Sequence, residues 1–420
     1  MDILVIGGGG REHALVAAFR KNKDVHTIYA LPGNGGISDI ATCVPIGTKE
    51  LDKIVLFAKE KQVDFVVVAP DDPLVLGLVD LLEEQKIPCF GPNKRAAIIE
   101  GSKVFSKNLM KKYHIPSASY QVFTEVEAAL EYANSCPLPS VVKADGLALG
   151  KGVVIATNRE ELCQAIESMM VEKKFGSSGN SVVIEEFLIG PEVSVLAFTD
   201  GKTLVPMVSS MDHKRAYDLD RGPNTGGMGT IAPNPYFTVA IQERCMQEIF
   251  IPTMEAMRSE GRPFKGCLYF GLMLTPVGPK VIEYNCRFGD PEAQVVLPLL
   301  ESDLLSICMA VANESLDSKQ VKFSTDAACC VVLASGGYPV SYQTGKEISL
   351  NPLKDGVSLY HAGTKKDGSR LLTSGGRVLN VVATAPTLRQ AVDKAYRGVD
   401  SVTFEAMHFR RDIGQSALQA

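Results

Sequence analysis

Residues 281–292 read Val281-Ile282-Glu283-Tyr284-Asn285-Cys286-Arg287-Phe288-Gly289-Asp290-Pro291-Glu292, a pattern that predicts a strand running into a turn. Side chains alternate along a strand, so we expect Glu283, Asn285 and Arg287 to share one side. Val281 is expected at the buried end of that same side. The opposite, apolar layer is expected to take Ile282, Tyr284, Cys286 and Phe288.

A row of carboxylate, carboxamide and guanidinium groups is poor core material, because burying charge without partners is costly. Carboxylate and amide oxygens bind Mg²⁺, and arginine pairs with phosphate or carboxylate through its fork of donors. The row therefore predicts a site for a hard cation and a polyphosphate. The local pattern leaves one alternative open, an edge strand with a solvated polar face.

Length and composition limit the kinds of protein that this chain can be. The chain has 420 residues, too many for one core, which indicates about two to four domains. Apolar residues make up 45% and charged residues 22%, as in ordinary soluble globular proteins. The net charge is −5 and no long basic run occurs, so a nucleic-acid partner is not expected.

The cysteines and the apolar segments indicate a compartment. Ten cysteines are scattered without a Cys-x-x-Cys pair, which favours reduced thiols over zinc or disulfides. From Asp2 the chain enters a short apolar run and glycines, the pattern of a first strand and not of a signal peptide. No apolar segment approaches the ~20 residues that span a membrane. We therefore expect no membrane partner and a cytoplasmic location.

The order of elements predicts several domains. Short apolar strands at 2–6, 27–30, 65–69 and 89–90 alternate with helical patterns, which indicates a parallel sheet covered on both faces. One linker helix is expected at 93–113, followed by a small unit with strands at 140–144, 153–156 and 181–185. Long strands and a final α+β segment complete the chain. The expected domains are 1–100, 101–190, 191–325 and 326–420.

Two glycine-rich loops look familiar but miss their motifs. After Gly7 to Gly10, Glu12 stands where a dinucleotide fingerprint needs glycine, and the second strand lacks the ribose-binding acid, so NAD is disfavoured. An anion site near Arg11 and a plain tight turn both remain open. Gly150-Lys151-Gly152 lacks the spacing of a P-loop and is expected to act as a flap over phosphates.

Further charged residues have both functional and structural interpretations. Lys143 lies in an apolar strand, where it needs an anion or faces outward, and Lys103 is weaker evidence. The strand end with Glu185 and Glu186 suits a purine, with Glu192 for ribose hydroxyls, although a solvated turn explains these acids equally well. The charged cluster 212–215 precedes the glycine-rich loop 222–229, which favours function over a bland surface loop.

Taken together, these segments resemble the ATP-grasp superfamily, and within it the phosphoribosylamine–glycine ligase (glycinamide ribonucleotide synthetase) family. The resemblance covers nearly the whole chain. It rests on an ordered set of motifs: Gly-Gly-Arg-Glu-His at 9–13, Pro-Gly-Asn at 32–34, Lys-Ala-Asp-Gly-Leu at 143–147, Gly-Lys-Gly at 150–152, Asp-His-Lys-Arg at 212–215, Gly-Pro-Asn-Thr-Gly-Gly-Met-Gly at 222–229, Asn-Cys-Arg-Phe-Gly-Asp-Pro-Glu at 285–292, His-Ala-Gly-Thr at 361–364 and Gly-Gly-Arg-Val at 375–378.

The resemblance implies an α/β, ATP-grasp architecture. Its parts are an N-terminal Rossmann-like (pre-ATP-grasp) parallel-sheet domain, a small α/β lid, a larger α+β body with the metal site and a C-terminal α+β domain. It implies a ligase that joins glycine to 5-phosphoribosylamine in de novo purine biosynthesis. ATP becomes ADP and phosphate through a glycyl phosphate intermediate, giving glycinamide ribonucleotide. The implied cofactors are ATP and Mg²⁺ (or Mn²⁺), and the implied assembly is a monomer or homodimer.

The resemblance also implies roles for the residues at matching positions. The metal ligands are Glu283 and Asn285, and the catalytic residues are Arg287, Asp290, Asp212 and Lys214. ATP is bound by Lys103, Lys143, Gly146, Gly150, Lys151, Gly152, Glu185, Glu186, Phe187, Leu188 and Glu192. The other substrates are bound by Gly9, Arg11, Glu12, Pro32, Gly33, Asn34, Asn224, Thr225, Gly226 and Gly227.

Three positions depart from the family pattern. Gly271 stands where many ATP-grasp enzymes carry a further metal carboxylate, so phosphate oxygens or water must complete the shell. Pro70-Asp71-Asp72-Pro73 replaces an expected Pro-Glu-Ala-Pro, and the extra charge should weaken anion binding unless Asp72 points away. Leu149 replaces a usual alanine in the flap.

Competing interpretations are an ATP-grasp carboxylase or peptide-forming ligase and a non-catalytic nucleotide-binding module.

Overall fold

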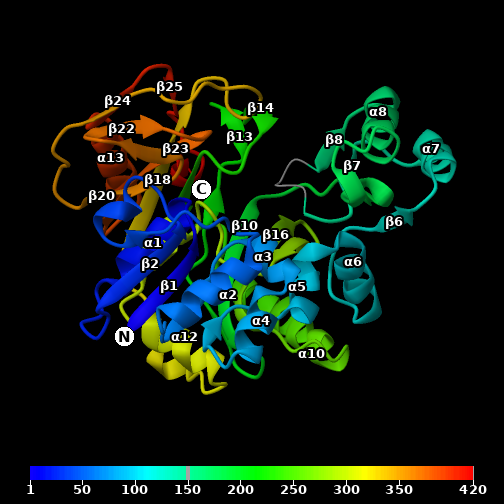
Figure 1. Cartoon of the computed structure of the whole chain (residues 1–420). Helices are drawn as coiled ribbons and strands as arrows, with labels where there is room; N and C mark the ends of the chain where they lie inside the picture. Colours follow the sequence, from blue (N-terminus) through cyan, green and yellow to red (C-terminus); the bar gives the residue numbers. More distant parts are fainter. Residues whose placement is uncertain (148–151, 420) are drawn as a thin grey trace.

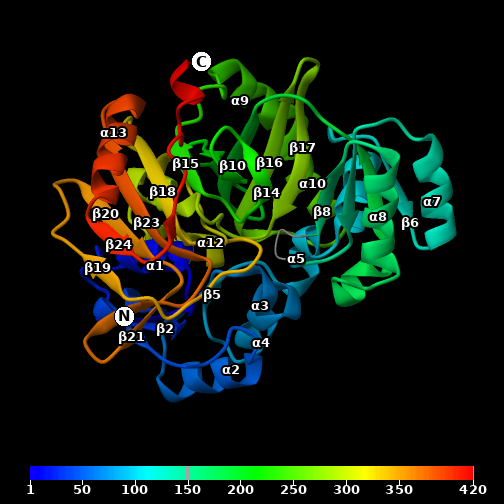
Figure 2. The same ribbon diagram turned by 90° about the horizontal axis from the view of Figure 1, so that it is seen from above.

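The computed structural model describes residues 1–147 and 152–419 (Figure 1). An N-terminal parallel sheet, a central body and a C-terminal sheet pack together. A lid that contains α7 and α8 stands away from the rest of the molecule in both Figure 1 and Figure 2. The ATP-binding residues predicted at Gly150 and Lys151, and the departure at Leu149, lie outside the described residues.

The N-terminal sheet has five parallel strands in the order β3-β2-β1-β4-β5. Its elements are β1 (Asp2–Gly7), α1 (Gly10–Phe19), β2 (Thr27–Pro32), β3 (Thr42–Cys43), α2 (Leu51–Glu60), β4 (Phe65–Val68), α3 (Asp71–Leu76), α4 (Leu78–Glu84) and β5 (Cys89–Phe90). Along β1, Ile3 packs in one core with Leu15 of α1, while Leu4 packs in another with Ile54 of α2. This alternation confirms a parallel sheet covered on both faces.

The predicted linker helix at 93–113 is wrong in one respect, because it is two helices. These are α5 (Lys94–Gly101) and α6 (Lys103–Lys112). Ser102 between them has an extended backbone (φ −140°, ψ 116°), and its hydroxyl accepts a hydrogen bond from Phe105 N. A serine that caps the second helix satisfies an otherwise unpaired N–H, which stabilises the break.

The lid forms its own small core. Its strands pair antiparallel in the order β6-β9-β7-β8, and Val142, Ile166 and Ile184 pack between sheet and helices. The elements are β6 (Tyr120–Phe123), α7 (Val126–Ser135), β7 (Ser140–Ala144), β8 (Val153–Ala156), α8 (Arg159–Met170) and β9 (Val182–Glu186). A unit with a separate core can shift relative to the body without unfolding.

The body sheet is antiparallel, in the order β11-β10-β16-β17. Its strands are β10 (Glu192–Asp200), β11 (Leu204–Pro206), β16 (Lys265–Thr275) and β17 (Gly278–Asn285). Packed against this sheet are α10 (Ile251–Ser259), after α9 (Val239–Cys245), and α12 (Leu304–Ala312), after α11 (Ala293–Val296).

The strict alternation predicted for β17 is wrong at one end. A bulge shifts the register so that Gly271 pairs with Glu283 while Leu272 pairs with Val281. The extra residue turns Val281 into the apolar core that holds Tyr284 and Cys286, and leaves Ile282 outside that core. β17 also ends at Asn285, so Arg287 lies in the following turn and not on the strand.

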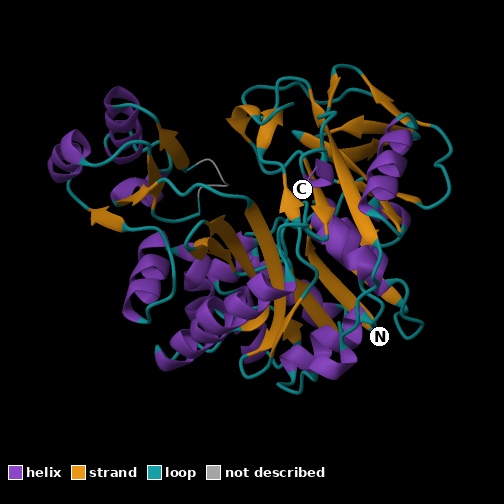
Figure 3. Ribbon diagram, turned by 180° about the vertical axis from the view of Figure 1, so that it is seen from behind, coloured by secondary structure: helices purple, strands orange, loops and turns teal. Residues whose placement is uncertain are grey.

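The C-terminal sheet crosses the expected boundary at residue 325. Its order is β12-β15-β18-β23-β20, so two strands from the middle of the chain extend it. Figure 3 shows the strands of the molecule in orange, seen from behind. The elements are β12 (Met211–Asp212), β15 (Gly229–Ala232), β18 (Ala327–Ser335), β20 (Val357–His361), β23 (Arg377–Ala385) and α13 (Leu388–Val399). The sheet therefore carries Asp212 at one edge and His361 at the other.

The ten cysteines are all free thiols, as predicted, and eight of them are buried. Among the helices of residues 1–147 and 152–419, none has the length and apolar character needed to cross a membrane.

Candidate active site

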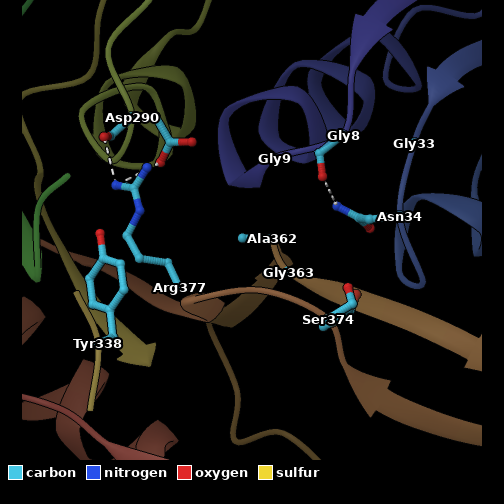
Figure 4. Close-up of a pocket in the computed structure, with 11 residues that line it drawn as sticks. Gly8, Gly9, Gly33, Asn34, Asp290, Tyr338, Ala362, Gly363, Ser374 and Arg377 are labelled. Carbon is cyan, nitrogen blue, oxygen red and sulfur yellow. Dashed lines mark hydrogen bonds and ion pairs between the residues drawn. The ribbon is translucent and has the colours of Figure 1, made fainter. Parts of the chain in front are cut away.

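A cavity of about 390 Å³ lies where the N-terminal sheet, the turn after β17 and the C-terminal sheet meet (Figure 4). It is lined by Gly8, Gly9, Gly33, Asn34, Asp290, Tyr338, Ala362, Gly363, Thr364, Ser374 and Arg377. The two N-terminal loops touch here: a Cβ on Gly8 would lie 2.3 Å from Gly33 O. Only glycine permits this approach, which brings the loop at 33 against the start of α1.

Arg377 is a charged residue of the cavity that bonds to two other segments of the chain. Its Nη1 donates to Gly226 O at 2.7 Å and to Asp290 O at 2.8 Å. The same guanidinium lies 3.3 Å from the Asp290 carboxylate, and Figure 4 shows the two side chains pointing toward each other. Burial alone would raise the pKa of Asp290, but Arg377 and Arg11 lower it. An arginine beside a helix N-terminus suits an anionic ligand.

Asn34, another predicted substrate residue, makes its side-chain hydrogen bonds to backbone groups of the protein. Asn34 Nδ2 donates to Gly8 O (2.9 Å) and His361 O (2.7 Å), while its Oδ1 accepts from Gly36 N and Ile37 N. The side chain therefore joins the N-terminal loops to the C-terminal sheet. Pro32, at the end of β2, is exposed and precedes Gly33.

Arg11 and Glu12 lie behind the glycine loop. Glu12 Oε2 accepts from Gly9 N at 2.6 Å, and Glu12 Oε1 lies 2.6 Å from Arg11 Nε. Arg11 Nη1 donates to Phe288 O at 3.1 Å, so the structure places Arg11 outside the cavity lining. These contacts hold the loop against the turn that follows β17.

The loop 224–227 contacts both Arg377, which lines the cavity, and Asp212. It follows β14 (Arg221–Asn224), and Thr225 Oγ1 donates to Lys214 O at 2.8 Å. Gly226 N donates to the Tyr338 hydroxyl at 3.0 Å. Gly227 has φ +111°, and a Cβ there would lie 2.6 Å from Asp212 Oδ1. The loop therefore connects Arg377, in the cavity lining, with Asp212 and Lys214.

Beside this loop, Lys214 joins two predicted carboxylates. Its Nζ lies 3.2 Å from Glu192 Oε2 and 3.9 Å from Glu283 Oε1. Glu192 is the main reason that the pKa of Lys214 is raised well above its ordinary value. Burial raises the pKa of Glu283, but Lys214, Lys143 and Lys103 lower it overall. Burial and then Glu292 raise the pKa of Asp212.

Glu283 and Asn285 have the donor atoms that Mg²⁺ prefers. The lysines around Glu283 keep it ionised, and Asn285 Nδ2 donates to Tyr284 O at 2.9 Å, which leaves the carbonyl oxygen for a cation. Within the described ranges, no group of three or more His, Cys, Asp or Glu side chains could hold a metal ion. A pair of oxygen ligands completed by phosphates and water fits Mg²⁺, which rarely uses an all-protein cage.

The predicted adenine residue Glu185 is buried between two lysines. Its Oε2 lies 3.1 Å from both Lys107 Nζ and Lys143 Nζ. Its Oε1 is buried and, within the described residues, has no hydrogen-bond partner. Lys143 also donates to Ile282 O at 3.1 Å, which joins the lid to β17. Burial lowers the pKa of Lys107 to about 8.

The remaining predicted ATP residues lie around the same strand end. Lys103 Nζ donates to Gly146 O at 2.8 Å, which ties the start of α6 to the lid loop. Gly152, directly before β8, is buried. Glu186 pairs with Lys280 at 2.8 Å. The two apolar residues that follow are at least partly exposed, Phe187 and Leu188.

Arg287 is held by an acid that the sequence did not indicate. Its Nη2 lies 3.1 Å from Glu100 Oε1, and Glu100 Oε2 accepts from Cys286 N at 2.7 Å. Burial raises the pKa of Glu100, while Arg287 opposes that rise. Arg287 Nε is buried without a partner among the described residues, so one donor remains for a ligand.

The structure accounts for two of the three departures from the family pattern. Gly271 pairs with Glu283 across the sheet. A carboxylate at position 271, as many ATP-grasp enzymes carry, would therefore lie beside the predicted metal ligand. Asp72 is not among the residues that line the cavity, and it pairs with Lys49 at 2.9 Å. Asp71 instead faces Arg287 and Arg11, which lower its pKa against the effect of burial.

Sequence reasoning missed several residues of this site. Lys107 lies one helical turn after Lys103, a spacing that puts both on one face. Two other missed residues lie beside motifs that were noticed. Arg377 is part of Gly-Gly-Arg-Val at 375–378, and Glu100 directly precedes Gly101-Ser102-Lys103. Local patterns carry no signal for Tyr338, whose place depends on the fold of its loop.

Three buried histidines predict acid-sensitive stability. Burial lowers the pKa of His13 to about 3 and those of His213 and His361 to about 4, from 6.5. The unfolded chain therefore binds these protons first, and stability is lost as pH falls below about 6.5. We expect the free energy of unfolding in urea to drop by up to ~1.4 kcal/mol per pH unit for each histidine. A His13→Gln variant should show a shallower slope, and a flat profile from about pH 7 to pH 5 would contradict this assignment.

Comparisons with known proteins identify the family of the chain. Models of phosphoribosylglycinamide synthetase match three consecutive parts: the N domain at residues 1–100, the ATP-grasp (A) domain at 101–293 and the C domain at 328–416. A phosphoribosylamine–glycine ligase of Halalkalibacterium halodurans is 48% identical over 419 residues, covering 100% of this chain and 97% of that protein.

Solved structures have the same fold. The crystal structure of phosphoribosylamine–glycine ligase from Thermotoga maritima aligns with a TM-score of 0.85 and 34% identity, over 98% of this chain and 100% of that one. The biotin carboxylase domain of a Hydrogenobacter thermophilus 2-oxoglutarate carboxylase, solved with MgADP and bicarbonate, aligns at 0.75 with 17% identity, over 97% and 91% of the chains. The second likeness concerns the fold alone. The predicted architecture is confirmed, and the chain belongs to the phosphoribosylamine–glycine ligase family.

Proposed function

We propose that the chain is an ATP-dependent carbon–nitrogen ligase that joins glycine to 5-phosphoribosylamine, giving glycinamide ribonucleotide, ADP and phosphate in purine biosynthesis. One observation carries the proposal: the loop 224–227 contacts Arg377, which lines the cavity, and also Asp212 and Lys214, so the cavity and the Lys214–Glu283 cluster are neighbours. Two substrates bound on either side would meet at Asp212 and Asp290. The acting form is proposed to be a cytoplasmic monomer or homodimer.

The cavity suits the sugar phosphate. Its polar lining combines the N-terminus of α1 at Gly9 with the Arg377 guanidinium and the hydroxyls of Thr364 and Ser374. A phosphate would take the helix N-terminus and the arginine, while ribose hydroxyls would take the smaller polar groups. The amine would then face Asp290, beside Gly227.

The nucleotide is proposed to lie between the lid and β17. Lys103 and Lys143 would hold its phosphates, and Glu185, Phe187 and Leu188 would surround the adenine, with Glu192 at the ribose. Glu283 and Asn285 would hold Mg²⁺, with Mn²⁺ as a substitute. When bound, the metal would screen the phosphate charge.

The chemistry requires two steps at neighbouring positions. A glycine carboxylate oxygen would attack the γ-phosphorus, and ADP would leave. The amine would then attack the carbonyl carbon of glycyl phosphate, phosphate would leave, and the nitrogen would lose a proton. Arg287 would orient the carboxylate, because its Nε has no partner among the described residues. Lys214 and Asp212 would hold the charges that develop, and the lid would exclude water.

A coupled assay for ADP release, with each substrate omitted in turn, tests the proposal. We expect ADP only when ATP, glycine and phosphoribosylamine are all present. ADP release driven by bicarbonate, or by another amino acid and amine, would assign the chain to a different ATP-grasp reaction and contradict the proposal.

A further inference from the structure

His213 is a buried histidine that the proposed function does not use. It lies between Asp212 and Lys214, and only 4% of its surface is exposed. Its ring contacts two backbone groups: Nδ1 lies 3.1 Å from Gly229 O, and Gly414 N donates to Nε2 at 3.1 Å. Because a backbone N–H can only donate, Nε2 must be the acceptor. Nδ1 therefore carries the proton and donates to Gly229 O.

These contacts join three separate segments of the chain. His213 N donates to Gly229 O at 2.9 Å, and Met228 N donates to His213 O at 2.8 Å, so the backbone is already tied to the start of β15. The bond from Gly414 adds a segment 201 residues further along the chain. The ring is thus the direct link between the Asp212–Lys214 segment and the C-terminal tail.

The tail, residues 409–414, is itself rigidly held. Arg410 is 1% exposed and lies 2.7 Å from both Asp220 and Asp412. Its Nη1 also donates to Arg215 O at 3.2 Å, one residue beyond Lys214. On the other side, the Tyr396 hydroxyl of α13 donates to Arg410 O and accepts from Ile413 N, both at 2.9 Å. Gly414 N therefore has a fixed place relative to the hairpin of β13 (Arg215–Tyr217) and β14.

Burial favours the neutral form of the His213 ring. Arg410, Asp220 and Asp412 are the charged groups that face it. Burial lowers its pKa to about 4 and Arg410 adds to this effect, whereas Asp220 and Asp412 oppose it. At neutral pH, Nε2 is therefore unprotonated and able to accept from Gly414 N.

We propose that His213 is a positioning residue for the ligase reaction, which sets the geometry of Asp212 and Lys214 by anchoring their backbone to the C-terminal tail. The inference rests on the proposed function, because it assumes that Asp212 and Lys214 face the reacting groups. It makes the last part of the chain a component of the active site. No residue of the tail needs to touch a substrate.

Two matched substitutions separate the two ring contacts. In His213→Asn, the amide nitrogen can take the place of Nδ1 and donate to Gly229 O, but nothing accepts from Gly414 N. In His213→Gln, the longer side chain can place its carbonyl oxygen near Nε2 and keep the bond to the tail. We expect kcat to fall about 10- to 100-fold in His213→Asn and about 3-fold or less in His213→Gln.

The readout is kcat in the coupled ADP assay, together with nucleotide affinity by equilibrium binding and the thermal midpoint. A positioning role predicts that kcat falls in His213→Asn while ATP affinity is unchanged. Equal activity of both variants and the wild type would overturn the inference. Equal loss in both would also overturn it, because it would assign the effect to packing around the ring.

If His213→Asn does not fold, an Arg410→Lys variant tests the inference instead. It keeps the charge but loses the fork that pairs with Asp220 and Asp412. A loss of kcat with unchanged ATP affinity would support the inference, and wild-type kcat would overturn it. The wild type is assayed in parallel: absence of ADP release there would refute the proposed function, whereas an active wild type with an equally active His213→Asn would refute only the positioning role.

Discussion

Glu283→Gln is expected to lower turnover by about 10³-fold while leaving the fold intact. The substitution keeps the shape of the side chain but removes the charge that faces Lys214, Lys143 and Lys103. It also removes the only carboxylate of the proposed metal pair, because Gly271 stands opposite. The lysines would then be left with excess positive charge beside the nucleotide.

The measurement is kcat in the coupled ADP assay, with Mg²⁺ binding followed by calorimetry in the presence of a non-hydrolysable ATP analogue. Glu248→Gln is the matched control, since Glu248 is an acid of the body that pairs with Arg244 at 2.7 Å away from this cluster. The control should retain wild-type kcat. Retained turnover or Mg²⁺ affinity in Glu283→Gln would place the metal ligands elsewhere.

Arg287→Met should be the most destabilising single change around the site. Only 18% of the Arg287 side chain and 6% of the Glu100 side chain are exposed, and the pair is 3.1 Å apart. Removing the cation leaves Glu100 buried without its counter-charge, which costs about 3–5 kcal/mol. We expect a fall of this size in the free energy of unfolding in urea, and loss of activity.

The double variant Arg287→Met, Glu100→Gln isolates the charge effect. Glutamine removes the unpaired charge and keeps an oxygen that can accept from Cys286 N. We expect the double variant to recover more than half of the lost stability, yet to remain inactive because the guanidinium is absent. A single variant as stable as the wild type would show that the ion pair is not the main anchor of this turn.

Much of the fold was predictable because its signals are local. The continuous apolar run Ile3-Leu4-Val5-Ile6 predicts a buried strand, and its two sets of side chains pack in different cores. The order of motifs was enough to identify the family. The break at Ser102 and the bulge before Glu283 were not predictable, since each depends on what neighbouring elements require of the backbone.

The sequence by itself determined the parallel N-terminal sheet, the lid strands, the family, and the candidate acid and amide at 283 and 285. These follow from contacts along the chain or between adjacent strands, which residue type and spacing encode directly. Only the tertiary structure decided that Glu100 meets Arg287 across 187 residues, that Arg377 meets Asp290 O across 87, and that the tail reaches His213 across 201. Such pairs are set by how whole elements pack, so no local pattern contains them.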